Sequence, residues 1–179
     1  MKALLIAALL APPALAQTPA PAVVPTPPVI AKDHEALLAS PDPKLAANKR
    51  LVYDMYREVL QAGHYDRIPH YMLPTYIQHN PNVSSGADKL AEYVKNSRPV
   101  RPIEPKLMLP LINIIAERDM VTLAFVRRET DEQGHEYLTS WFDMFRIENG
   151  KIAEHWDPAM KSAKMLQADP NKARDLVNP

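Results

Sequence analysis

The sequence predicts an α+β protein in which N-terminal helices pack on the concave face of a strongly curved antiparallel sheet. Apolar residues recur at helical spacing from Lys44 to Ala62, and four runs rich in β-branched and aromatic residues follow between Leu107 and Asp157. Strands of about eleven residues are longer than usual, and sheets built from such strands coil strongly. A curled sheet that is covered by helices should enclose a cavity.

Composition narrows the class of protein. A chain of 179 residues with 46% apolar and 23% charged residues suits one soluble globular domain. The 21 basic and 21 acidic residues balance without a basic cluster, so we expect a small hydrophobic molecule as partner, and neither nucleic acid nor a membrane surface. Cysteine is absent, which excludes disulfides, thiol catalysis and thiolate metal sites.

The N-terminal residues 1–16 have the pattern of a secretory signal peptide. A positive start precedes the apolar run Ala3–Leu10, and a small-residue cleavage site ends at Ala16. We therefore expect a mature chain that starts at Gln17 and is periplasmic or secreted, with no membrane contact after cleavage. Residues 17–43 are rich in proline and alanine and predict an extended, mobile linker, with room for a short helix at residues 33–39.

The predicted domain covers residues 44–160. Helical periodicity and capping residues place three helices and a short strand in its first half: helices at Lys44–Ala62, His64–Tyr71 and Gly86–Asn96, and a strand that starts near Tyr76 and ends at Asn80-Pro81. Residues 161–179 form a C-terminal tail, in which one short helix is expected near Lys161–Gln167.

The second half of the domain should be β. The four runs are Leu107–Glu117, Met120–Thr130, Glu136–Ile147 and Lys151–Asp157. Short polar connectors make them consecutive antiparallel neighbours. Pro110 cannot donate a ladder hydrogen bond, so the first run should be an edge strand or carry a bulge.

The last two strands carry the candidate chemistry. Side chains alternate along a strand, so Asp143 shares a face with Trp141 and Phe145, and the same alternation places His155 and Asp157 on one side of the next strand. A carboxylate among aromatic rings is costly to desolvate, which favours exchange of a proton near neutral pH. The alternative is structural: Asp143 caps a turn or pairs with an arginine, and His155 and Asp157 only finish the sheet edge.

His79 stands at the end of the short strand and could share a proton with the carboxylates, although a lone histidine is more often structural. Together with Asp143, His155 and Asp157 it offers the atoms that a metal needs. No local spacing signature supports a metal, however, and we assign none.

Several segments together carry a family resemblance: Tyr76-Ile77-Gln78-His79-Asn80-Pro81, Asp143-Met144-Phe145-Arg146, Gly150-Lys151-Ile152 and Glu154-His155-Trp156-Asp157. Their order resembles the SnoaL-like branch of the nuclear transport factor 2-like superfamily, which includes polyketide cyclases and aldol-condensation-type proteins. The resemblance implies a cone of helices around a curved sheet, a pocket with polar residues on the inner strands, and a homodimer formed through the sheet. It implies no cofactor.

The resemblance and the strand pattern together define a predicted site. Its catalytic residues are Asp143, Asp157 and His79, and its ligand-binding residues are Trp141, His155, Trp156, Tyr76, Asn80 and Phe145. Limonene epoxide hydrolases look similar in their acidic positions, but no arginine shares the Asp143 face of its strand, so that reaction is set aside.

Three functions stay open at this point. The chain could be a cofactor-free lyase, isomerase or cyclase acting on a small hydrophobic carbonyl compound, a non-catalytic binder of a hydrophobic ligand, or a dimeric interaction module. An apolar pocket with two or more carboxylates favours the first function. Neutralisation of Asp143 by arginine favours the second, and a filled interior favours the third.

Overall fold

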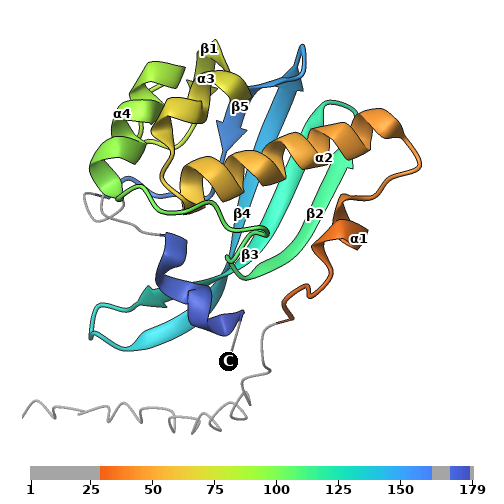
Figure 1. Cartoon of the computed structure of the whole chain (residues 1–179). Helices are drawn as coiled ribbons and strands as arrows, with labels where there is room; N and C mark the ends of the chain where they lie inside the picture. The colour runs from red at the N-terminus through yellow and green to blue at the C-terminus, as the bar shows by residue number, and fades with distance from the viewer. Residues whose placement is uncertain (1–28, 163–169, 178–179) are drawn as a thin grey trace, which may run out of the picture.

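The computed structural model describes residues 29–162 and 170–177, and these form helices packed on one five-stranded sheet (Figure 1). The strand order is β1-β5-β4-β3-β2. The strands are β1 (Met72–Gln78), β2 (Leu111–Glu117), β3 (Met120–Thr130), β4 (Glu136–Glu148) and β5 (Lys151–Trp156). The predicted α+β architecture, with helices against a curved open sheet, is confirmed.

The sheet is mixed, which corrects the expectation of a wholly antiparallel one. Strands β2 to β5 form the predicted antiparallel meander, but β1 pairs in parallel with β5, with Ile77 opposite Glu154 and Gln78 opposite His155. The direction of an isolated strand depends on how the helices before it dock, which no local pattern records. The edge position predicted from Pro110 is confirmed for β2, although this strand starts at Leu111 rather than at Leu107.

The long amphipathic helix lies across the inner face of the sheet (Figure 1). It begins as α2 (Pro43–Met55), where Asp42 caps the backbone amides of Lys44 and Leu45, and it continues as the π-helical turn η1 (Tyr56–Gln61). Its buried side chains meet inner-face residues of the sheet in one core, whose largest fully buried members include Met55, Tyr76, Phe145, Leu123 and Ile152.

The remaining helices follow the predicted order. The second predicted helix is a 3-10 turn (Tyr65–Arg67) that continues into α3 (Ile68–Tyr71), and the third is α4 (Ala87–Ser97). The tail adds the 3-10 segment η4 (Pro170–Leu176), which the sequence did not predict. The signal peptide, residues 17–28 of the linker and most of the Lys161–Gln167 helix lie outside the described residues.

The end of the predicted linker is not a free tether. Helix α1 (His34–Leu38) packs against α2: Leu38 is buried, and Nζ of Lys49 donates hydrogen bonds of 2.6 Å to the carbonyl oxygens of Leu37 and Ala39. The backbone amide of Ala31 also donates to the carbonyl of Leu111. One turn of helix offers too few positions to show an apolar stripe in sequence, so only the docked structure reveals this contact.

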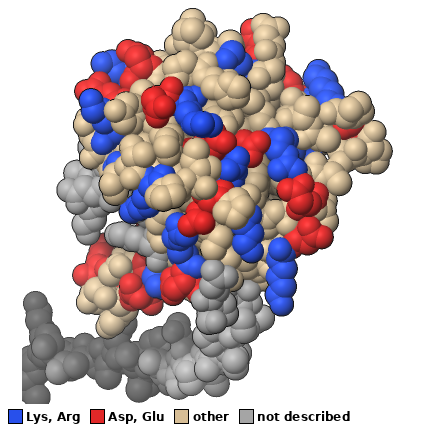
Figure 2. Space-filling model, viewed as in Figure 1, with Lys and Arg blue, Asp and Glu red and all other residues tan. Residues whose placement is uncertain are grey.

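The surface matches the neutral composition. On the face drawn in Figure 2, Lys and Arg side chains alternate with Asp and Glu side chains, with other residues between them. In the part of the chain that is described, no helix is both long enough and apolar enough to span a membrane.

Candidate active site

A cavity of about 160 Å³ lies between the inner face of the sheet and the helices. Its wall is mainly apolar and aromatic, with contributions that include Met55, Leu60, Met72, Val83, Leu90, Leu109, Phe125, Trp141 and Phe145. The ionisable side chains of Asp143, His155 and Asp157 also line it, together with those of Arg98 and Arg127. A dry cavity of this size can hold a molecule about as large as benzene. The interior is therefore not filled, contrary to what an interaction module alone requires.

Strand pairing brings the three ionisable groups together. The β4–β5 hairpin turns at Asn149-Gly150, where both residues have positive φ angles of 51° and 72°. The resulting register places His155 opposite Phe145, so that its ring packs against the Phe145 ring with centroids 4.6 Å apart. Asp143 lies two residues from Phe145 on the same face of β4, next to the imidazole. The predicted inward orientation of Asp143 and His155 agrees with their burial.

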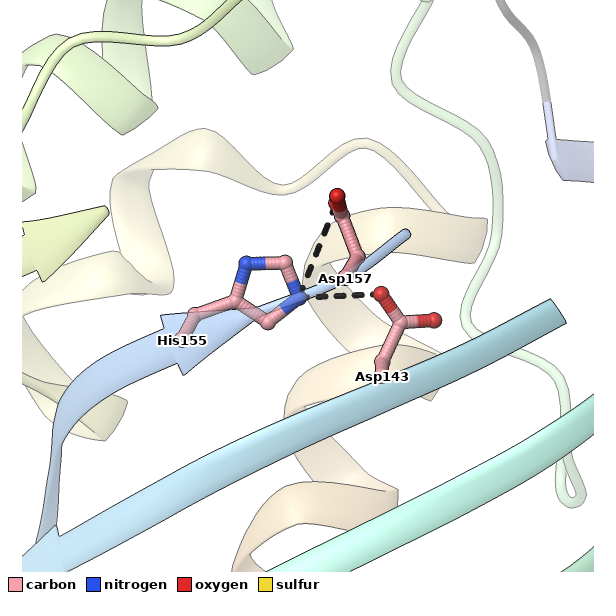
Figure 3. A group of neighbouring side chains, drawn as sticks. All are labelled: Asp143, His155 and Asp157. Atoms are coloured by element: carbon pink, nitrogen blue, oxygen red, sulfur yellow. Dashed lines mark hydrogen bonds and ion pairs between the residues drawn. The ribbon is translucent and has the colours of Figure 1, made fainter. Parts of the chain in front are cut away.

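The imidazole of His155 directs one nitrogen, Nε2, toward both carboxylates (Figure 3). Its Nε2 atom is 2.9 Å from Oδ1 of Asp143 and 4.0 Å from Oδ2 of Asp157. All three side chains are nearly inaccessible to solvent. Such burial makes an unpaired charge costly, so the three groups must share their charges and protons.

The end of β1 supports this cluster through amide side chains. Oε1 of Gln78 is 2.7 Å from Nδ1 of His155, and Nδ2 of Asn80 donates a hydrogen bond of 2.7 Å to Oδ2 of Asp157. The other oxygen of Asp157 accepts a hydrogen bond from the backbone amide of Ala159. These hydrogen bonds hold the Asp157 carboxylate in position.

Two tyrosines complete the polar end of the cavity. Burial, and then the nearby charge of Asp143 and a hydrogen bond to it, raise the pKa of Tyr56 well above its ordinary value. Burial followed by the charges of Asp143 and Asp157 raises the pKa of Tyr76 as well. Both phenols therefore keep their protons at neutral pH and act as hydrogen-bond donors. The hydroxyl of Tyr76 accepts from Nε2 of Gln78, which leaves its own hydrogen for a ligand.

Among the described residues, Asp143, His155 and Asp157 form the cluster whose spacing would suit a metal ion, because one ligand atom from each lies within 4.8 Å of the others. The two closest atoms are already joined at hydrogen-bonding distance. A hydrogen bond between His155 and Asp143 accounts for this geometry without a further ion.

Most of the predicted site residues meet in the cavity. Those that line it are Asp143, Asp157, Trp141, His155, Tyr76, Asn80 and Phe145. Their placement agrees with the predicted site, while their roles stay predictions.

His79 and Trp156 do not line the cavity, which corrects the expectation that His79 joins Asp143 and Asp157. Their rings stack on each other with centroids 4.6 Å apart and planes 8° apart, and Nε2 of His79 lies 3.1 Å from Oε2 of Glu154. The His79 side chain is 41% exposed. The reason is strand parity: His79 and Glu154 face away from the side on which Gln78 and His155 point inward.

Sequence reasoning missed Tyr56 and Gln78. Tyr56 looked like an ordinary apolar position of the amphipathic helix, and Gln78 was noticed only as part of a motif. Parity relative to the buried Tyr76 would have placed Gln78 on the inner face, whereas nothing in the helix pattern marks Tyr56 as a partner of Asp143. Tyr56 begins the π-helical turn η1, and such turns are frequent at functional sites.

The fold and the site define an α+β protein with an acid–base cluster at the end of an apolar cavity. The model of the SnoaL-like polyketide cyclase family matches residues 50–168, and the chain belongs to this family. The resemblance noted in the sequence is thereby confirmed.

Solved structures with similar folds share little sequence with this chain. TsrD from Streptomyces laurentii is 21% identical, with a TM-score of 0.45 over 66% of this chain and 90% of that one. A protein of unknown function, described as like nuclear transport factor 2, from Burkholderia pseudomallei is 18% identical, with a TM-score of 0.44 over 69% and 97% of the two chains. An epoxide hydrolase of the limonene type from M. tuberculosis is 14% identical, with a TM-score of 0.46 over 62% and 80%. No match is found among curated protein sequences.

Proposed function

We propose that the protein is an enzyme, a cofactor-free cyclase, isomerase or lyase that uses carboxylate acid–base chemistry on a small hydrophobic carbonyl compound. One observation carries the proposal: two buried carboxylates and an imidazole stand together in the wall of a mainly apolar cavity. Family membership supports the cyclase or isomerase class. The volume of about 160 Å³ favours a compact substrate, or one that inserts only its reacting part.

In this mechanism Asp157 is the base. Its two hydrogen bonds, from Asn80 and from the backbone of Ala159, fix the orientation of the carboxylate that accepts the proton. The carboxylate removes a proton from the carbon next to the substrate carbonyl, and the electron pair of that C–H bond moves into the enolate. The hydroxyl of Tyr76 donates a hydrogen bond to the developing oxyanion and keeps its proton. The enolate then attacks a second carbonyl group or recovers the proton at another position.

The hydrogen-bond partner of Asp143 separates this proposal from the binding-module alternative. Its partner at 2.9 Å is His155, a group that can gain and lose a proton, rather than a permanently charged arginine. In a site that only binds a ligand, a carboxylate is expected to be neutralised by a group that does not exchange protons. A carboxylate that is paired with imidazole instead retains acid–base capacity.

The test is exchange of carbon-bound hydrogen. Small ketones and 1,3-dicarbonyl compounds are incubated with the protein in deuterium oxide, and loss of the α-proton signal is followed by NMR. We expect catalysed exchange that falls about a hundredfold to ten-thousandfold in Asp157→Asn. His135→Asn, an exposed position far from the cavity in the β3–β4 turn, is the matched control. Saturable ligand binding without exchange in the parent protein would contradict the enzyme and leave the binding module.

We also propose that the enzyme is exported and acts in the periplasm or outside the cell. The proposal rests on the order of positive, apolar and small residues in positions 1–16. Mass spectrometry of the exported protein should give a mature chain that starts at Gln17, in part as pyroglutamate. A periplasmic fraction that retains Met1 would contradict it.

A further inference from the structure

We propose that Gln78 is a positioning residue that fixes the tautomer of His155 and so places one proton between His155 and Asp143. The inference deepens the proposed function and rests on it, because the proton held by this pair is the acid that complements Asp157 as base. It concerns the resting protein, however, and is measured without a substrate.

The orientation of the Gln78 amide follows from a backbone contact. The backbone N–H of Asn80 lies 3.1 Å from the atom assigned as Oε1 of Gln78. A backbone N–H only donates, so this atom must be the carbonyl oxygen and not the amide nitrogen. The amide nitrogen, on the other side, donates to the hydroxyl of Tyr76 at 3.1 Å.

The oxygen of Gln78 then decides which nitrogen of His155 carries hydrogen. It lies 2.7 Å from Nδ1, and because it has no hydrogen to give, Nδ1 must be the donor. The contact is built into the sheet, since Gln78 of β1 is paired directly with His155 of β5. Gln78 and Asn80 thus hold His155 with its Nδ1 protonated.

This tautomer leaves Nε2 with a lone pair that faces the Asp143 carboxylate at 2.9 Å. Two acceptors cannot form a hydrogen bond, so one further proton must lie between them. The pair is either imidazolium with carboxylate or neutral imidazole with carboxylic acid, and in both forms its net charge is zero. The hydroxyl of Tyr56 donates a further hydrogen bond to the Asp143 carboxyl group. The Asp157 carboxylate, 4.0 Å from Nε2, stabilises the imidazolium form.

The two carboxylates therefore have different roles that are set by their surroundings. Asp157, held by two donors, takes the carbon-bound proton. The His155–Asp143 pair gives its proton to the substrate oxygen: the bond between the proton and the pair breaks, an O–H bond forms, and the pair becomes anionic. One proton is taken and one is given, so the neutral enol forms without an external acid, and the proton on Asp157 later returns to the pair.

The test is the tautomer of His155 in protein with ¹⁵N-labelled histidine. The chain has six histidines, so the His155 signals are identified by their loss in His155→Gln. We expect a protonated Nδ1 in the parent over about pH 6 to 8, the range in which an ordinary imidazole titrates. Gln78→Leu should lose this preference, and Gln78→Glu, which keeps an acceptor at the same place, should retain it and remain folded.

Activity supplies a second, separable readout. If exchange activity is found, Gln78→Leu should lower kcat about tenfold to a hundredfold and change its pH profile, with a smaller effect on KM, and Gln78→Glu should restore much of the rate. An unprotonated Nδ1 in the parent would overturn the inference even if the protein is active. A chelator-sensitive metal bound at Nε2 would overturn it too. A protonated Nδ1 in a protein without exchange activity would uphold the tautomer lock and defeat the proposed function instead.

Discussion

The side-chain amide of Asn80 donates a hydrogen bond of 2.7 Å to the carboxylate of Asp157, which joins the end of β1 to the residue that follows β5. Asn80 is itself held, because its Oδ1 accepts from the backbone and side-chain amides of Asn82. The Asp157 carboxylate is thus held in position by a chain of amides.

We predict that Asn80→Ala destabilises the fold by about 2 kcal/mol, because it removes one of the two donors that hold the buried Asp157 carboxylate. A double-mutant cycle with Asp157→Ala, measured by urea unfolding, should show a coupling energy of about 1 kcal/mol or more. Asn96→Ala on the exposed side of α4 is the matched control and should change the free energy of unfolding by less than about 0.5 kcal/mol. Strict additivity of the Asn80 and Asp157 substitutions would contradict the supporting role.

We predict that the stability of the fold depends on the shape and hydrogen bonds of the Asp143 side chain and not on its charge. In Asp143→Asn the new amide can donate to Nε2 of His155 while its oxygen accepts from Tyr56, so the free energy of unfolding should change by less than about 1 kcal/mol. Asp143→Leu should cost about 1 to 3 kcal/mol because both partners are left unpaired. Thermal melts and proton exchange assays of the two variants check this. A loss of stability in Asp143→Asn as large as in Asp143→Leu would show that the charge itself is structural.

The two histidines of the predicted site should behave differently. His155→Gln removes a group inside the cavity, and we expect exchange activity to fall about a hundredfold or more. His79→Gln changes a side chain on the outer face of the sheet and should leave the rate within about threefold, since interactions there do not reach the substrate. Equal losses in both variants would restore His79 to the catalytic set.

Docking of α1 should weaken in acid. The pKa of His34 lies below its ordinary value of 6.5, chiefly because the side chain is buried. The positive charge of Lys106 also lowers this pKa. The hydrogen bond to the Ala31 carbonyl and the charges of Asp33 and Glu35 raise it, but not enough to reverse the shift. Above pH 6.5 the histidine is neutral in both the folded and unfolded chain. As the pH falls below 6.5 the unfolded chain binds a proton first, so the free energy of unfolding decreases until the folded state is protonated as well.

The measurement is urea unfolding between neutral and mildly acidic pH. Nδ1 of His34 lies 2.8 Å from the hydroxyl of Tyr53, and His34→Gln keeps a polar partner for that hydroxyl without titrating. This variant should lose part of the acid sensitivity, whereas His135→Gln at an exposed position should keep it. Identical pH profiles for the parent and His34→Gln would contradict the prediction.

We propose that the outer face of the sheet forms a homodimer, as the sequence led us to expect. Phe142 is 52% exposed and Ile115 59% exposed, and strand pairing places them on the face opposite the cavity, near Met144. Exposed apolar side chains that gather on one face of a sheet mark an association surface. Phe142→Glu should convert a dimer into a monomer in light scattering, and Val100→Glu, an exposed apolar position in the loop after α4, should not. A monomeric parent at micromolar concentration would refute the dimer.

Local patterns were sufficient for the class of fold and for one wall of the site. The helical period of residues 44–62 predicted the long helix, and alternation in β4 and β5 placed Asp143 and His155 on the inner face, because both signals depend on residues a few positions apart. Alternation also explains why Trp141 and Phe145 were found with Asp143 in the cavity wall.

Tertiary structure decided how distant elements meet. The parallel pairing of β1 with β5 sets Gln78 beside His155 and turns His79 outward, and packing of the long helix on the sheet brings Tyr56 to Asp143. The docking of α1 belongs to the same group of contacts. Such contacts join residues that are 12 to 87 positions apart. They form only after the chain has folded back on itself, and no local period in the sequence encodes them.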